Sequence, residues 1–169
     1  MPAISEDYHL IVTGGRYPTG SISPEGTAFV FDAATGAFLR RISSPDQFGG
    51  SSFFSFVAIE GSKALIGAPD VLVSPGVGGR AHLFDLATGA NLLTFNESDG
   101  YSSSTEKFGS SVALEGNVAV IGAPSAGDGS LAPSQLWRGF AYVYNATTGE
   151  KTHTLSASDW EFSAYFGWS

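Results

Sequence analysis

Short apolar runs recur along this chain in nearly the same order of residues. The run FSFVAIEGSKALIGAP at residues 54–69 returns as SSVALEGNVAVIGAP at residues 110–124. A second pattern, AFVFDAATG at residues 28–36, returns as AHLFDLATG at 81–89 and as AYVYNATTG at 141–149. Runs of β-branched, aromatic and small apolar residues bounded by Gly, Pro, Asn or Asp are typical of short strands. Because self-similarity at a period of about 50–60 residues indicates one repeated structural unit, the chain is predicted to be an all-β repeat protein.

The D-A-A-T-G type segments are predicted to be hairpin loops. An Asp or Asn opens each loop, where its side-chain oxygen can accept hydrogen bonds from backbone N–H groups further along. A Gly closes each loop and can take the left-handed conformation that a bulged hairpin turn needs. The opening residues are Asp32, Asp85 and Asn145, and the closing residues are Gly36, Gly89 and Gly149.

The segment VAVIGAP is apolar on both faces of a strand, so we expect it to be covered on both sides. Gly-Ala lets two backbones approach closely, and Pro is expected to end strand pairing because it has no N–H. The stretch after the first GAP, residues 70–79, is therefore expected to be a loop. The Phe of an FG pair is expected to fill the space between adjacent sheets, while its Gly permits a bend. These motifs comprise Gly67, Ala68, Pro69, Gly122, Ala123, Pro124, Phe108 and Gly109.

Four strands in each unit and strands that are apolar on both faces favour a β-propeller. We expect one partial propeller domain over residues 1–169, with blades at about residues 8–47, 48–107 and 108–165. Residues 166–169, FGWS, are expected to open a further blade. The first blade is expected to lack its initial strand, which gives about eleven strands in all.

Composition narrows the classes of function. The 169 residues are 43% hydrophobic and 14% charged, with 22 Gly and 8 Pro, which is typical of a folded chain with many turns. The formal net charge of −8 argues against binding to nucleic acid and to anionic membrane surfaces. Cysteine is absent from the sequence, so it holds no disulfide. Its first ten residues lack the basic start and apolar middle of a signal peptide.

The segment FGSSVALEGNVAVIGAP followed by GFAYVYNATTG resembles the FG-GAP repeat of bacterial proteins and, more distantly, that of integrin alpha-subunit propellers. The resemblance covers about residues 8–169. It is nearly complete over residues 108–157 and partial in the first unit, where TGGRYP replaces GAP. It implies a propeller used for adhesion, ligand binding or assembly outside the cytoplasm.

On that basis we expect a non-catalytic binding or assembly module of an extracellular or cell-surface structure. Its expected partners are another protein, or further propeller blades from a longer chain or from neighbouring subunits. Two alternatives stay open: an accessory propeller of a larger secreted enzyme, and a lectin-like module that binds a glycan.

Many FG-GAP proteins carry a calcium loop of the D-x-D-x-D-G kind, which this chain lacks. The loops after the two GAP motifs each hold one carboxylate, Asp70 and Asp128. Calcium takes about six to eight oxygen ligands. We therefore expect no cofactor and no calcium or other metal site.

Three residues are candidates for contact with a partner. Trp137 and Arg138 lie together in the longest loop, and an exposed aromatic–Arg pair is typical of binding hot spots. The alternative is that Trp137 packs over the edge of its own blade. Trp160 belongs to the aromatic run DWEFSAYFGW, which could stack on a sugar or on a protein partner, whereas Phe166 fits a plug between blades better.

The remaining polar residues predict no catalytic set. The G-x-S-x-G motif of hydrolases is absent from the sequence, and the three histidines stand singly on predicted strands. His82 and Tyr142 occupy the same repeat position, so His82 is expected to be structural. The acids, Asp46 among them, are scattered over turns.

Two asparagines begin N-x-S/T sequences that can accept an N-glycan, Asn96 and Asn145. Asn96 starts a polar linker, whereas Asn145 opens a tight hairpin. If the chain passes through a eukaryotic secretory route, we expect Asn96 to be glycosylated before Asn145.

Overall fold

The computed structural model describes eight stretches of the chain. They are residues 3–4, 9–13, 27–46, 56–74, 77–97, 107–126, 139–157 and 166–168. For residues 3–4, 9–13, 72–74 and 77 only the backbone is described. Every regular element in these stretches is a β-strand. None of the described residues forms a helix long and apolar enough to cross a membrane.

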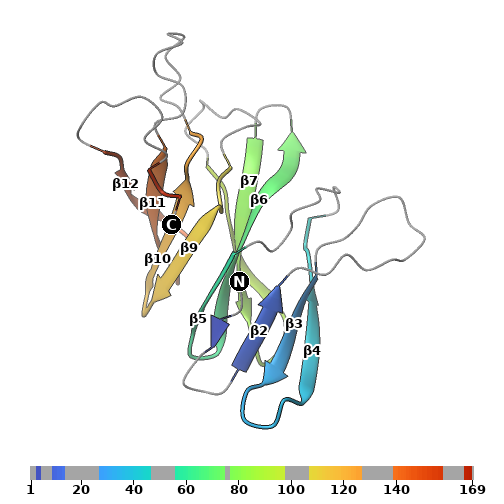
Figure 1. Ribbon diagram of the computed structural model, residues 1–169. Helices are drawn as coiled ribbons and strands as arrows, with labels where there is room; N and C mark the ends of the chain where they lie inside the picture. The colour runs from blue at the N-terminus through green and yellow to red at the C-terminus, as the bar shows by residue number, and fades with distance from the viewer. Residues whose placement is uncertain are drawn as a thin grey trace.

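Within the described residues, twelve strands form three antiparallel sheets of four, and each sheet is assembled from strands that follow one another in the chain (Figure 1). The first sheet contains β1 (Ala3–Ile4), β2 (His9–Thr13), β3 (Thr27–Asp32) and β4 (Phe38–Ser43). The second contains β5 (Phe56–Glu60), β6 (Lys63–Ser74), β7 (Val77–Asp85) and β8 (Asn91–Phe95). The third contains β9 (Ser111–Glu115), β10 (Val118–Ala123), β11 (Phe140–Asn145) and β12 (Lys151–Leu155). The predicted all-β propeller segment of three four-stranded sheets is confirmed.

The first sheet differs from its prediction, because it does not lack an initial strand. Ala3 and Ile4 pair with Ile11 and Leu10 of β2, in the place that β5 and β9 take in the later sheets. The expectation failed because a two-residue strand is too short to show alternation in the sequence, and only pairing with β2 identifies it. The first sheet therefore also begins before residue 8.

The stretch after the first GAP motif is not the predicted loop. β6 runs through Pro69 to Ser74, and it pairs with β7 again at Leu72–Gly78 and Ser74–Val77. The register shifts between Ala68 and Leu72, so Pro69 interrupts the ladder without ending the strand. A proline removes only its own N–H from a ladder, and a bulge can absorb that gap. In the third sheet the prediction holds, since β10 ends at Ala123, before Pro124.

The three hairpin loops follow their predicted chemistry. Oδ1 of Asp32 accepts hydrogen bonds from the backbone N–H groups of Ala34 and Thr35, at 3.0 and 2.8 Å. Asp85 and Asn145 cap their loops in the same way. The closing glycines have φ of 70°, 77° and 77° at Gly36, Gly89 and Gly149. Each loop is followed by a register shift in the third–fourth strand pair, as a bulged hairpin requires.

Apolar side chains fill the two spaces between neighbouring sheets. Strand β6 lies in the middle, and Ala64, Leu65 and Ile66 are all 0% exposed because adjacent sheets cover both of its faces. The cluster between the first and second sheets includes Ala28, Val30, Ile42, Ala64, Ile66, Phe84 and Leu86. The cluster between the second and third sheets includes Leu65, Leu83, Phe95, Phe108, Leu114, Ile121, Tyr142 and Tyr144. The chain is thus a stack whose stability comes from contacts between sheets.

Candidate functional site

The FG and GAP motifs meet at the joint between the second and third sheets. Phe108 is fully buried in the apolar cluster between these sheets, and its ring lies 5.6 Å from the ring of Tyr142. Gly109 follows at φ 92°, a conformation that favours glycine. A Cβ added to Gly67, the first residue of GAP, would lie 2.0 Å from the carbonyl oxygen of Gly109. The two motifs therefore interlock through backbones that leave no room for a side chain.

A further glycine completes this joint. Gly79 lies just before the part of β7 that pairs with GAP, and it forms a parallel bridge with Phe108. A Cβ at Gly79 would lie 2.2 Å from the carbonyl oxygen of Phe108. The sequence analysis placed Gly79 in a loop and assigned it no role. Its place before a third strand, where Gly139 stands in the next unit, is the signal that could have identified it.

The same joint is built again beyond the third sheet. A Cβ at Gly122 would lie 2.0 Å from the carbonyl oxygen of Gly167, and one at Gly139 would lie 2.2 Å from that of Phe166. The hydroxyl of Ser111 donates a hydrogen bond to the Gly167 carbonyl at 2.8 Å. Phe166 and Gly167 thus sit on the third sheet as Phe108 and Gly109 sit on the second.

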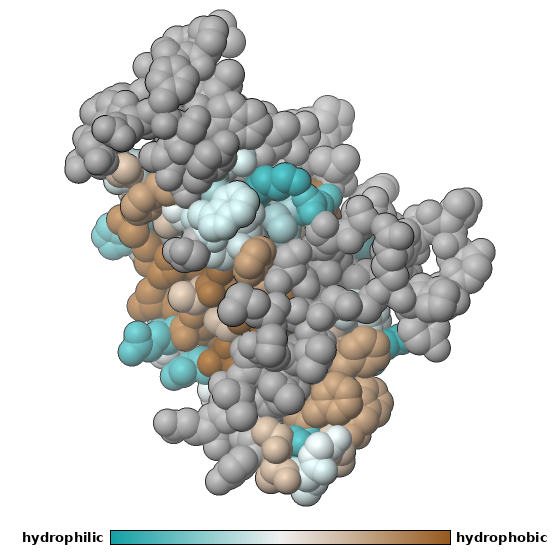
Figure 2. All heavy atoms as spheres, in the orientation of Figure 1, coloured by the Kyte–Doolittle hydropathy of each residue, from teal (hydrophilic) through white to brown (hydrophobic). Residues whose placement is uncertain are grey.

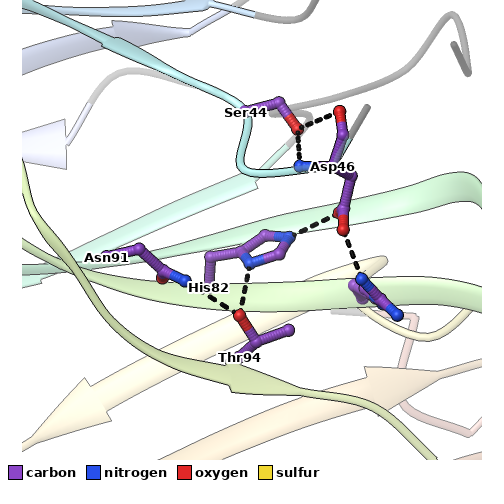
Figure 3. Close-up of polar contacts among 6 residues, drawn as sticks. Ser44, Asp46, His82, Asn91 and Thr94 are labelled. Atoms are coloured by element: carbon purple, nitrogen blue, oxygen red, sulfur yellow. Dashed lines mark hydrogen bonds and ion pairs between the residues drawn. The ribbon is translucent and has the colours of Figure 1, made fainter. Parts of the chain in front are cut away.

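A polar cluster joins the first sheet to the second (Figure 3). Asp46, three residues after β4, forms an ion pair with Arg80 and lies 2.9 Å from Nε2 of the fully buried His82. Nδ1 of His82 lies 3.1 Å from Oγ1 of Thr94, which also accepts a hydrogen bond from Nδ2 of Asn91 at 2.9 Å. The carboxylate comes from the first sheet's exit segment and its partners from β7, so the cluster clamps two sheets together.

Electrostatics favour the ionised form of Asp46. Burial raises the pKa of this carboxyl, but the hydrogen bond and charge of His82 and the charge of Arg80 outweigh burial. The net result is a pKa below the ordinary value of 3.8. The Asp46 side chain is only 6% exposed, so solvent screens these interactions weakly.

An acid also links the second sheet to the third. Glu97, two residues after β8, is buried and accepts a hydrogen bond from the hydroxyl of Tyr142. Since Tyr142 and His82 occupy one repeat position, the first and second sheets each send an acid to the same place on the sheet that follows. The prediction that His82 is structural agrees with this geometry, but the sequence analysis treated Asp46 as a turn residue and overlooked Glu97. The sequence signal that could have identified both residues is an acid shortly after each fourth strand.

The candidate partner-binding residues are not placed. Trp137, Arg138 and Trp160 lie outside the described residues, as does Asp128 of the second GAP loop. No group of three or more His, Asp or Glu that could hold a metal ion occurs within the described residues. Asn96 is exposed, while Oδ1 of Asn145 accepts hydrogen bonds from two backbone N–H groups in its hairpin.

An apolar depression opens on the third sheet. Its volume is about 340 Å³, and it is lined by Ala113, Leu114, Glu115, Val118 and Val120 of β9 and β10. Figure 2 shows hydrophobic side chains gathered over this sheet, on the left, and over β3 and β4 of the first sheet, at the lower right. Apolar patches of this kind are suited to contact with another protein surface.

Comparisons with known proteins identify the repeat and the fold. The family model described as FG-GAP repeat matches residues 97–144. A europium-containing methanol dehydrogenase is similar in structure, with a TM-score of 0.56 and 12% identity over 90% of this chain and 23% of that chain. A quinohemoprotein alcohol dehydrogenase from Comamonas testosteroni is similar with a TM-score of 0.57 and 19% identity, over 91% of this chain and 20% of that one. Another quinohemoprotein alcohol dehydrogenase, from Pseudomonas putida HK5, has a TM-score of 0.56 and 17% identity, over 92% of this chain and 20% of that one.

These solved structures are much longer than this chain, which covers only 20–23% of their length. At identities of 12–19% the likeness concerns the fold. The search of curated proteins finds no match. The matched residues 97–144 run from the Glu97 contact through the FG pair and GAP to Tyr144 of β11. Residues 97–144 therefore match the FG-GAP repeat and lie within a β-propeller segment of three four-stranded sheets.

Proposed function

We propose that this chain is a non-catalytic β-propeller module that serves protein binding or assembly in an extracellular or cell-surface structure. The observation that carries the proposal is the position of its polar groups. Asp46, Arg80, His82 and Glu97 all lie at joints between sheets, where they hold the stack together. The described surface also offers apolar patches outward, including the depression on the third sheet. Exposed apolar patches suit contact with proteins.

A second candidate is an accessory propeller within a larger secreted enzyme. The observation in its favour is the structural similarity to a short portion of much longer dehydrogenase chains. In that role the propeller would support a catalytic part that lies elsewhere. The full reading frame of the gene distinguishes the two candidates, because an enzyme requires a further catalytic domain.

Binding of the whole chain to two kinds of probe tests the proposal. The chain is immobilised and exposed to the matrix proteins fibronectin and type I collagen, and in parallel it is labelled and applied to a glycan array. We expect saturable binding to a matrix protein and no saturable binding to the glycans of the array. Saturable glycan binding that disappears in Trp137→Ala or Trp160→Ala would replace the proposal with the lectin-like alternative. Binding to neither kind of probe would contradict the adhesive form of the proposal.

A further inference from the structure

A network of hydrogen bonds connects the joint between the first and second sheets to an exposed residue of the second sheet. Its inner end is the carboxylate of Asp46, which lies 2.9 Å from Nε2 of the fully buried His82. Nδ1 of the same imidazole lies 3.1 Å from Oγ1 of Thr94 (Figure 3). Thr94 belongs to β8 and is exposed. A buried acid is thus linked through a buried imidazole to a hydroxyl group of an exposed residue.

Only part of this network joins the two sheets. Asp46 follows the first sheet, so its contacts with Arg80 and His82 of β7 cross the joint. Thr94 and His82 both belong to the second sheet, where they are paired across β8 and β7. The contact between the imidazole and the hydroxyl therefore connects no two sheets. The clamp between the sheets does not explain why an exposed threonine lies on this imidazole.

The ionised carboxylate sets the direction of each hydrogen bond. The lowered pKa of Asp46 keeps its side chain ionised near neutral pH, so it only accepts hydrogen bonds. In the neutral imidazole of His82, Nε2 then carries the hydrogen and Nδ1 keeps its lone pair. The hydroxyl of Thr94 donates to that lone pair, while its Oγ1 accepts a hydrogen bond from Nδ2 of Asn91 at 2.9 Å. This is the arrangement of a nucleophile, a general base and an orienting acid.

We propose that Thr94 is a site of covalent acylation, with His82 as its general base and Asp46 as the residue that positions the imidazole. The co-reactant is an activated acyl donor, either an ester or a thioester. Oγ1 of Thr94 forms a bond to the acyl carbon, and the hydroxyl proton passes to Nδ1 of His82. The bond between the acyl carbon and the leaving oxygen or sulfur breaks, and the leaving group takes the proton from the imidazole. The products are an O-acyl threonine and a free alcohol or thiol.

The surroundings of the hydroxyl favour one acylation over repeated turnover. Acyl-transfer enzymes stabilise the developing oxyanion with preorganised hydrogen-bond donors in a site that excludes water. Here the amide of Asn91 donates to Oγ1 of Thr94, but Asn91 is exposed, so solvent competes for that amide. The inference therefore goes beyond the proposed binding function and is compatible with it, because it adds a modification site to a non-catalytic module.

The chain contains two matched controls for Thr94. Thr154 stands at the same repeat position on β12 and is also exposed, but it is paired with Tyr142 in place of a histidine. Thr152 does have an imidazole beside it, since Nδ1 of the exposed His153 lies 3.1 Å from its Oγ1. Within the described part of the chain, His153 has no carboxylate partner. Thr154 therefore controls for the imidazole, and Thr152 controls for its orientation by a buried acid.

Acetylation of the whole chain by 4-nitrophenyl acetate near neutral pH tests the proposal. Peptide mass spectrometry at successive quenching times measures the initial rate of acetylation at each threonine. Alkaline hydroxylamine distinguishes acetyl esters from acetyl-lysine, because it cleaves esters and leaves amides. General-base catalysis contributes about 10²–10⁴-fold, so we expect Thr94 to be acetylated at least about tenfold faster than Thr152 and Thr154. A rate at Thr94 no higher than that of either control overturns the proposal.

His82→Tyr tests the role of the imidazole. The repeat itself provides this exchange, because Tyr142 stands at the same position in the third sheet and donates a hydrogen bond to Glu97. The variant keeps a donor for the acid and removes the base, so acetylation of Thr94 should fall to the rate of Thr154. Unchanged acetylation in a variant that circular dichroism shows to be folded would contradict the role of His82. If the variant unfolds, the rates at the three threonines of the parent chain still decide the question.

Asp46→Asn tests the positioning of the imidazole. The amide N–H of asparagine can donate to Nε2 of His82 and so place the hydrogen on Nδ1, where it blocks the base. Acetylation of Thr94 should then fall at least about tenfold. If Asp46 only joins the sheets, its loss leaves the rate unchanged or raises it by opening the joint, and either result overturns its positioning role. The matrix-protein and glycan measurements use the unmodified chain, so they decide the proposed function separately.

Discussion

The contact between the FG and GAP motifs predicts that replacing the buried Gly67 with alanine destabilises the fold. Gly67 lies in β6 without a positive φ, so its backbone suits any residue. A Cβ there would lie 2.0 Å from the Gly109 carbonyl oxygen and 3.0 Å from its carbonyl carbon. Both neighbours are backbone atoms of the segment that leads into β9, and they cannot rotate away as a side chain would. Gly67→Ala must therefore push two sheets apart at the place where they interlock.

Gly36→Ala is the matched control. Gly36 has φ of 70°, but a Cβ there meets nothing within 4 Å. Alanine at this position lowers the free energy of unfolding by about 1–2 kcal/mol, because it must adopt the left-handed conformation. The smaller entropy of the unfolded chain with alanine reduces this loss. The entropy change is shared by both variants and cancels in the comparison. Overpacking of a joint costs about 1–3 kcal/mol and more where backbone must move, so we expect Gly67→Ala to lose about 3 kcal/mol and Gly36→Ala about 1.

Urea unfolding followed by far-ultraviolet circular dichroism measures the difference. With a slope of about 2 kcal/mol per molar urea, the midpoint of Gly67→Ala should fall about 1 M below that of Gly36→Ala. The slopes of the two variants should agree, which shows that their unfolded states are alike. Equal midpoints for the two variants would refute the argument that FG and GAP are in backbone contact.

Three further predictions follow from single features of the structure. Because the folded-state pKa of Asp46 lies below its ordinary value of 3.8, its carboxylate stabilises the fold above that pH and loses the effect as pH falls through the lowered pKa. Asp46→Asn should therefore reduce the fall of the unfolding midpoint as the pH is lowered. An acid dependence equal to that of the parent chain would contradict the role of Asp46 in joining the two sheets. Chelation by EDTA should leave the melting temperature unchanged, since neither stretch after a GAP motif holds enough carboxylates for calcium. A fall in melting temperature that micromolar calcium reverses would show a site. Expression in a eukaryotic secretory system should add glycan to Asn96, which is exposed, before Asn145, whose Oδ1 accepts two backbone hydrogen bonds; glycopeptide masses that place glycan on Asn145 alone would reverse this order.

Local chemistry explains why much of the fold could be read from the sequence. The hairpin loops depend on an Asp or Asn and a Gly a few residues apart, so the contacts that Asp32 and Gly36 make lie within the loop itself. Strand identity follows from short apolar runs, and repetition of those runs gives the number of sheets. The burial of Phe108 and the close approach at Gly67 were also predictable, because both belong to repeated motifs.

Features that depend on partners distant in the chain could not be read in this way. Ala3 and Ile4 form a strand only because β2 lies beside them, and β6 continues past Pro69 only because β7 resumes pairing with it. The acid clamps are long-range too, since Asp46 and His82 are 36 residues apart. An acid recurs shortly after each fourth strand in the sequence, but nothing near Asp46 indicates that its partner is His82.

The sequence by itself therefore determined the repeat, the strands and their turns, since these arise from interactions between residues close along the chain. Only the tertiary structure decided which faces of the sheets are covered. Val30, Leu83 and Val143 occupy the same position of the sequence repeat, yet the first two are fully buried and the third is partly exposed. Burial is a property of the neighbouring sheet and not of the residue, because apolar surface is removed from water only where another surface is placed against it.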